Sequence, residues 1–293
     1  MKQLSDDIFQ KIQRIEFVSK HLATDILAGA YKSAFKGRGM EFEEVREYFP
    51  GDEIRSIDWN VTARMNHPYV KNFREERDLT VMLAVDVSAS SRFGSGITKS
   101  HVIAEIGAVL AFSAIKNNDR VGLLLFSSDI EHYLPPRKGT RHVLQLIREL
   151  LVFKPKHPGT DLAKALSYLG KVQNRSTICF LISDFFCSDF FREANIISKK
   201  HDLISISVTD PYEYDFPDVG LVTLSDLESD EQGVIDSSDN NVRAYFQKSA
   251  AERIEYVSQM MKKIGAGFID IRTDHSYVLP LRKFFKIRMA KRK

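Results

Sequence analysis

Short runs of apolar residues alternate with stretches of helical periodicity over the last three quarters of the chain, and this alternation constrains the fold most. The runs are TVMLAV (80–85), VGLLLF (121–126), TICFLI (177–182), LISISV (203–208), VGLVTL (219–224) and FIDI (268–271). A strand that is apolar on both faces lies inside a mostly parallel sheet. The helical stretches lie near 97–116, 139–152, 161–171, 189–200 and 241–264. The pattern predicts an α/β fold with a doubly wound, mostly parallel sheet.

The N-terminal part has a different pattern. Residues 5–26 carry apolar side chains at three- and four-residue intervals behind Ser5, Asp6 and Asp7, which predicts a capped amphipathic helix that docks on the main body. We therefore expect residues 1–77 to form an N-terminal extension of helical and irregular or β structure. Residues 78–293 are expected to form the α/β domain and to end in a basic C-terminal helix.

The composition excludes several classes of protein. The longest run without a charge, Ile106 to Ile115, has ten residues, whereas a membrane span needs about 20. The first ten residues contain acids and no apolar core of a signal peptide, and two cysteines, Cys179 and Cys187, are too few for a disulfide scaffold or a zinc ribbon. No phosphate-binding glycine loop follows a strand, and the histidines lack zinc-hydrolase spacing. These features predict a cytoplasmic protein that is not an enzyme.

Charge is concentrated in two segments. Residues 281–293 hold seven Lys or Arg and no acid, whereas residues 210–240 hold ten Asp or Glu and no Lys or Arg. A uniformly basic surface for specific nucleic-acid binding is therefore not expected. The tail predicts a short basic amphipathic helix, which either docks its aromatic side chains on the domain or makes a weak contact with a membrane surface or nucleic acid.

Aspartates follow most of the predicted strands. They are Asp86, Asp129, Asp184, Asp210, Asp226 and Asp274. The carboxyl ends of parallel strands share the edge of the sheet where ligands bind, although an aspartate there can also simply cap a helix or a turn. Asp86, Ser88 and Ser90 alternate directly after the first strand, so a carboxylate and two hydroxyls face the same side. Such hard oxygen ligands suit Mg²⁺, Mn²⁺ or Ca²⁺ better than zinc.

Two further elements give this pattern a family resemblance. Residues 157–161 place Thr160 in a loop before a helix, and residues 181–185 place Asp184 at a strand end. The arrangement resembles the metal-ion-dependent adhesion site (MIDAS) of von Willebrand factor A-type (vWA) domains. The resemblance implies that three hydroxyls bind the ion and that two carboxylates hold it mainly through water. The residues are Ser88, Ser90 and Thr160 for the hydroxyls, and Asp86 and Asp184 for the carboxylates. Ser91 stands where these domains usually have methionine.

A second resemblance covers most of the chain. The block GD-x-x-R-x-IDW at residues 51–59, with Arg46 and Tyr48 before it and Ala63-Arg64 after it, resembles a bacterial domain-of-unknown-function family, number fifty-eight in that series. The longer members of that family carry N-terminal membrane helices, which this chain lacks. Members are commonly encoded beside MoxR-type AAA+ ATPases, so the resemblance implies such an ATPase as a protein partner.

The block itself allows two interpretations. In the first it is structural, with Trp59 as an anchor and the arginines bound to carboxylates. In the second it is a partner-binding surface that contains Arg55, Asp58, Trp59 and Arg64, because tryptophan and arginine are enriched where proteins bind one another.

The sequence leaves three functions open. The leading one is a MIDAS-type protein-binding module, an adaptor or co-chaperone for a MoxR-type ATPase with Mg²⁺ as the preferred ion. The second is an Mg²⁺-dependent phosphatase or phosphoacceptor that uses Asp86, although Ser88 replaces the second acid that such phosphatases carry. The third is binding to membranes or nucleic acid through the basic tail at 281–293.

Overall fold

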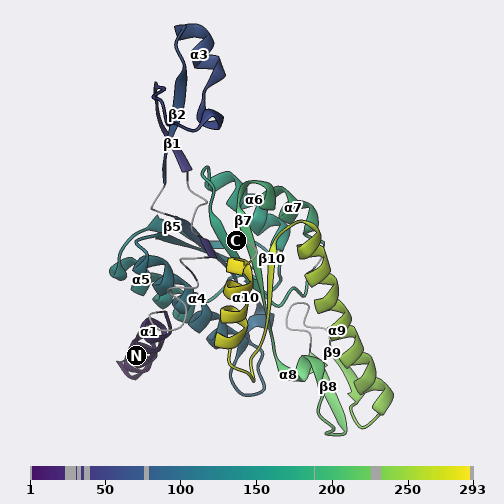
Figure 1. The fold of residues 1–293 in the computed structure, drawn as a ribbon. Coiled ribbons are helices and arrows are strands. Elements are labelled where there is room, and N and C mark those ends of the chain that lie inside the picture. Colours follow the sequence, from purple (N-terminus) through teal and green to yellow (C-terminus); the bar gives the residue numbers. More distant parts are fainter. Residues whose placement is uncertain are drawn as a thin grey trace.

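A six-stranded sheet forms the centre of the molecule in a computed structural model, which describes residues 2–23, 31, 34–35, 40–75, 79–187, 189–225 and 232–290 (Figure 1). The strand order is β10-β7-β6-β3-β4-β5, and every neighbouring pair is parallel except β4 and β5. The strands are β3 (Thr80–Asp86), β4 (Arg120–Phe126), β5 (Ile130–Arg137), β6 (Ile178–Ser183), β7 (Asp202–Thr209) and β10 (Gly267–Arg272). The predicted α/β fold with a mostly parallel sheet is confirmed at this level.

Helices cover both faces of the sheet. One face packs against α1 (Lys2–Leu22), α4 (Lys99–Lys116), α5 (Thr140–Val152) and α10 (Val278–Ala290). The other face packs against α6 (Leu162–Val172), α7 (Phe191–Lys200) and α9 (Asn240–Lys263). Alternate residues of β3 enter the two cores, with Leu83 in the first and Met82 in the second, because successive side chains of a strand point to opposite faces. Among the described helices, none combines the length and apolar character that a bilayer span requires.

Five of the six apolar runs are strands of this sheet, and the prediction for the sixth is wrong. Residues 219–224 contribute β8 (Leu221–Ser225), which pairs only with β9 (Gln232–Asp236) in a separate antiparallel hairpin. Val219 and Leu221 are 61% and 75% exposed, so this run is not a buried strand. The sequence pattern did not predict β5. This strand contains Pro135 and Pro136, which are tolerated because β5 lies at the edge of the sheet.

The two terminal helices both dock on the first face. α1 begins at Lys2, upstream of the predicted cap at residues 5–7, and buries Ile15 while Val18 remains 37% exposed. Residues 24–26, the end of the predicted helix, lie outside the described part. In α10, Leu281 and Phe285 are fully buried, and the Phe285 ring lies 5.7 Å from that of Phe35. The apolar side of the basic tail therefore belongs to the core.

An arm extends from the body before the central sheet begins (Figure 1). β1 (Met40–Glu47) and β2 (Tyr69–Glu75) form an antiparallel pair, and η2 (Ile54–Ser56) and α3 (Trp59–Met65) lie between them at its tip. Among the described residues of the arm, Val70 is the one large apolar side chain with less than a tenth exposed.

The order of the strands reverses between the parallel neighbours β3 and β6, because the strands that follow them are added on opposite sides. After β3 the chain continues through α4 to β4 on one side, and after β6 it continues through α7 to β7 on the other. Loops that leave two parallel strands in opposite directions open a crevice at their carboxyl ends, which is where ligands bind in open α/β sheets.

Candidate functional site

Asp86 is the last residue of β3, and Asp184 directly follows β6, so the two carboxylates meet at this crevice. They line a small pocket together with Ser90, Ser91, Lys99 and Ser183. Asp86 is 2% exposed and Asp184 is 4% exposed. Two of the six predicted strand-end aspartates therefore share a site.

Both oxygens of Asp86 accept hydrogen bonds. The Ser88 amide donates to Oδ1 at 2.9 Å, and the Ser183 hydroxyl donates to Oδ2 at 2.7 Å. Burial, and then the charge of Asp184, raise the pKa of Asp86 to about 7. Within the described residues no cation pairs with this carboxyl group, and its raised pKa shifts it toward the neutral form.

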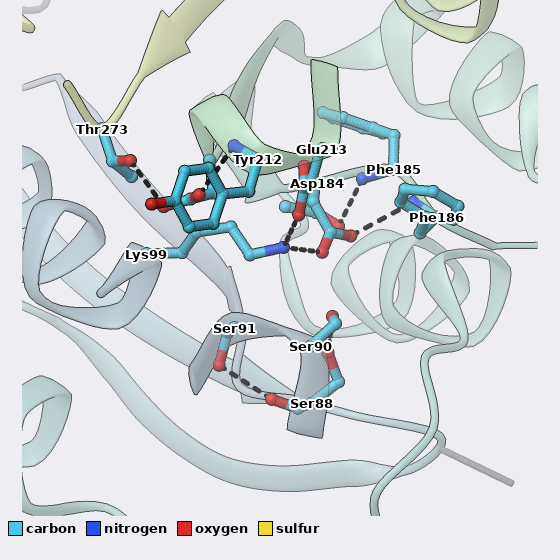
Figure 2. Close-up of polar contacts among 12 residues, drawn as sticks. Ser88, Ser90, Ser91, Lys99, Asp184, Phe185, Phe186, Tyr212, Glu213 and Thr273 are labelled. Carbon is cyan, nitrogen blue, oxygen red and sulfur yellow. Dashed lines mark hydrogen bonds and ion pairs between the residues drawn. The ribbon is translucent and has the colours of Figure 1, made fainter. Parts of the chain in front are cut away.

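The two predicted hydroxyl ligands lie side by side. The turn after β3 becomes η3 (Ala89–Arg92), and the Ser88 and Ser90 hydroxyl oxygens are 3.0 Å apart. The Ser91 hydroxyl donates to the Ser88 carbonyl at 2.8 Å, so this residue closes the turn from inside (Figure 2). The turn thus presents Ser88 and Ser90 as a pair of neutral oxygen donors.

Thr160 comes near this turn through its loop. The Ala89 amide donates to the Pro158 carbonyl at 2.8 Å, and Glu131 holds the same loop by accepting from the His157 amide at 3.0 Å. Thr160 is half-buried, but it is not among the residues that line the pocket. The structure therefore brings Asp86, Ser88, Ser90 and Asp184 together and leaves Thr160 in the adjoining loop.

The sequence analysis missed a buried cation in the same pocket. Lys99 begins α4 and is 2% exposed, and its ammonium nitrogen lies 2.7 Å from Asp184 Oδ2 and 2.5 Å from Glu213 Oε1 (Figure 2). Glu213 lies on α8 (Pro211–Tyr214), directly after β7. Burial opposes the charge of Lys99, but Asp184 and Glu213 together raise its pKa above the usual value. Burial also opposes the charge of Glu213 and raises its pKa, although the nearby Lys99 acts in the other direction.

One signal for Lys99 was present in the sequence. It follows Thr98, which caps α4, and a lysine in the first turn opposes the helix dipole. Such a placement indicates a local acidic partner. Glu213 gave no comparable signal, since it lies within the acid-rich segment 210–240.

The donor set fits a hard divalent cation in part. Among the described residues no three His, Cys, Asp or Glu side chains gather, but Asp86, Ser88 and Ser90 supply the oxygen ligands that Mg²⁺ and Mn²⁺ prefer. The uncompensated carboxyl of Asp86 favours a cation at this position. Asp184 differs, because Lys99 already provides it with a positive charge.

The other strand-end aspartates lie outside this pocket. Asp129 pairs with Lys164 at 2.9 Å and Asp274 with Arg272 at 2.9 Å, both on the surface. Asp210 is fully buried and accepts from the Ser95 amide and the Thr273 hydroxyl, so it fastens two loops together. Asp226 lies outside the described residues.

The side chains of the block at the arm tip divide into two groups. Arg46 binds Asp52 through two 2.7 Å hydrogen bonds, and Asp58 caps α3 by accepting from the amides of Asn60 and Val61. These side chains hold the tip together, as the structural interpretation predicted. Asp58 is 9% exposed, and its place in the partner-binding set stays a prediction.

The remaining members of that set face solvent. Trp59 is 66% exposed, so the prediction that it anchors the block is wrong. Arg55 and Arg64 are exposed as well, and neither has an ion pair within the described residues. Phe49, Ile54 and Met65 expose between 56% and 68% of their surface on the same tip. The tip thus presents an apolar surface with two arginines.

Comparison with known proteins identifies relatives over nearly the whole chain. The family described as "Protein of unknown function DUF58" matches residues 44–256. The uncharacterized proteins Rv1480 of Mycobacterium tuberculosis and Mb1516 of Mycobacterium bovis are each 31% identical over 279 residues, which cover 93% of this chain and 87% of theirs. The uncharacterized protein YeaD of Bacillus subtilis is 26% identical over 108 residues, 37% of this chain and 25% of its own.

Two solved structures are similar to the α/β body. BatB from Bacteroides thetaiotaomicron has a TM-score of 0.46, and an aerotolerance-related membrane protein from Bacteroides fragilis has a TM-score of 0.49. Each is 17% identical, and each comparison covers 73% of this chain and 99% of the other. At this identity and TM-score, the two structures give no information about the function of this chain.

Proposed function

Because the chain belongs to the DUF58 family, whose description assigns no function, we propose that it is a metal-ion-dependent protein-binding module of the vWA type. The observation that carries the proposal is the pocket at the carboxyl ends of β3 and β6. It combines an uncompensated buried carboxyl, Asp86, with the paired hydroxyls of Ser88 and Ser90. Oxygen donors of this kind favour Mg²⁺, with Mn²⁺ or Ca²⁺ as alternatives.

The proposed site uses the residues of the turn and its two neighbours. Ser88 and Ser90 would hold the ion directly, with Thr160 from the adjoining loop, and Asp86 and Asp184 would hold it mainly through water. A divalent ion at such a site supplies an open coordination position to a carboxylate of the partner. The buried hydrogen bonds of Asp86 keep its oxygens in place for this task.

The proposed partner is a MoxR-type AAA+ ATPase, for which this chain would act as an adaptor or co-chaperone. This part of the proposal rests on the family resemblance and not on a particular residue. The exposed tip of the arm is a second candidate contact, since Trp59, Arg55 and Arg64 have the composition of binding hot spots. An apolar pocket flanked by carboxylates would complement this tip.

The two alternative functions have less support. A nucleophilic Asp86 has to be ionised, whereas burial and the charge of Asp184 raise its pKa to about 7, and Ser88 stands where such phosphatases carry a second acid. A membrane-binding tail requires an exposed apolar side, whereas Leu281 and Phe285 are buried. We therefore propose a non-enzymatic module without a tail-mediated membrane function.

Thermal unfolding of the purified chain tests the ion site. Millimolar Mg²⁺ or Mn²⁺ should raise the melting temperature by several degrees, since a ligand at about 100 times its Kd adds about 2.7 kcal/mol to the free energy of unfolding. Asp86→Ala should remove this increment. Asp129→Ala is the matched control, because Asp129 also follows a strand but pairs with Lys164 on the surface. Equal increments in all three proteins would refute the site.

Pull-down with a MoxR-type AAA+ ATPase tests the partner. Binding should require Mg²⁺, weaken in EDTA, and fall on Ser88→Ala or Thr160→Ala while the circular dichroism spectrum is unchanged. Loss of a direct hydroxyl ligand leaves the ion poorly held, so the fall should be large. Binding that is equally strong in EDTA and in both variants would show that no metal ion bridges the two proteins.

A further inference from the structure

A lysine occupies the position of a counter-ion inside the proposed metal pocket. The Lys99 ammonium lies within hydrogen-bond distance of Asp184 and of Glu213, and all three side chains are at least half-buried (Figure 2). Asp184 and Glu213 come from the ends of β6 and β7, so Lys99 connects two loops of the crevice. Asp184 Oδ1 is bound as well, by the Phe186 amide at 3.1 Å.

The charges around the pocket define what Lys99 does. Asp184 lies near Asp86 on one side and near Glu213 on the other, and the Lys99 ammonium contacts Asp184 and Glu213. The Arg253 guanidinium stacks on the Phe186 ring and adds a second positive charge near Glu213 and Asp184. Lys99 also lines the same pocket as Asp86 and Ser90. A cation that enters this pocket therefore meets a positive charge that is already bound to Asp184.

We propose that Lys99 is a built-in competitor that sets the affinity of this pocket for divalent ions. The inference rests on the proposed metal site and specifies how it is regulated. While the ammonium is bound to Asp184, a divalent ion is repelled by it and cannot use the carboxylate of Asp184. The ion binds tightly only when Lys99 leaves Asp184, for which Glu213 provides a second acceptor.

The competition predicts opposite effects on stability and on metal affinity. Lys99→Gln removes the counter-ion of two buried carboxylates, so the melting temperature in EDTA should fall sharply. The same change frees Asp184 for a metal ion. Titration with Mn²⁺ alone by calorimetry should therefore give a Kd at least tenfold lower than for the wild type, and Mg²⁺ should restore most of the lost melting temperature.

A second variant covers the case in which Lys99→Gln does not fold without metal. Lys99→Gln with Glu213→Gln removes one positive and one negative charge, so the net charge of the pocket equals that of the wild type. Tighter Mn²⁺ binding by this double variant would identify competition at Asp184, because a general charge effect predicts no change. Lys164→Gln is the matched control, since it removes a lysine paired with the surface carboxylate of Asp129.

The outcomes separate this inference from the proposed function. A wild type that binds Mn²⁺ and a Lys99→Gln variant with equal or weaker affinity would overturn the inference and leave the metal site standing. If the Lys99→Gln variant binds Mn²⁺ and the wild type does not, the inference is supported and the proposed metal dependence of the wild type is refuted. If neither protein binds Mn²⁺, or if tight binding survives Asp86→Ala in the Lys99→Gln background, both are wrong.

Discussion

At the level of single residues, the pocket neutralises its carboxyl groups in two different ways. Lys99 compensates the charge of Asp184, whereas burial shifts Asp86 toward its protonated form. The positions of both aspartates could be predicted from the sequence, because carboxyl ends of adjacent parallel strands meet at one edge. The contact with Lys99 could not, since 85 residues separate it from Asp184 and 114 separate it from Glu213.

The raised pKa of Asp86 predicts how stability depends on pH without metal. From about pH 4 to pH 7 the unfolded chain loses the Asp86 proton while the folded chain keeps it. The folded state thus binds more protons, and the free energy of unfolding should fall over this window, by an amount on the order of a few kcal/mol. Asp86→Asn cannot titrate and should flatten the slope. Urea unfolding in EDTA measures it, and an unchanged slope in the variant would contradict the assignment.

At the level of secondary structure elements, burial on both faces decided which strands the sequence could predict. β3, β4, β6 and β7 are continuously apolar because helices cover both of their faces. β5 carries alternating and half-buried residues at the edge, and β8 exposes its apolar residues in a hairpin. β5 lacks the pattern of a central strand, whereas β8 has an apolar run like that of a central strand, which is why it was mispredicted. The N-terminal extension was expected to contain β structure, but the strands of the arm could not be placed, because four of the eight residues of β1 are glutamates.

The docking of α10 predicts that the C-terminal segment stabilises the fold. Phe285 is fully buried beside Tyr31, Phe35 and Phe284. Phe285→Ala should lower the free energy of unfolding by about 3–5 kcal/mol, because it leaves a cavity in the aromatic cluster. Lys283→Gln, at an exposed position on the same helix, should change it by less than about 0.5 kcal/mol. Chemical denaturation compares the two, and similar small effects would show that α10 is only loosely attached.

At the level of the whole molecule, the arm and the pocket lie at opposite edges of the central sheet. β2 ends at Glu75 and β3 begins at Thr80, so the arm joins the sheet at the amino end of β3. The pocket begins at Asp86, the carboxyl end of the same strand, and Figure 1 shows α8 and the arm at opposite ends of the molecule. A single small domain bound at the pocket therefore does not reach the arm tip.

This separation predicts that the two surfaces contribute independently to partner binding. Trp59→Ala should weaken binding to the ATPase on the order of tenfold to a hundredfold, because a two-thirds exposed tryptophan at a contact acts as a hot spot. It should leave the melting temperature and the Mg²⁺ increment unchanged, since Trp59 contributes nothing to the pocket. Tyr245→Ala, which removes an aromatic side chain 69% exposed on α9, is the control.

A double variant tests the independence of the two surfaces. When Trp59→Ala is combined with Ser88→Ala, the two losses in binding free energy should add, because distant sites without shared contacts do not couple. Surface plasmon resonance compares the wild type, the two single variants Trp59→Ala and Ser88→Ala, and the double variant. Strong coupling between Trp59 and Ser88 would mean that the arm folds back toward the pocket when the partner binds.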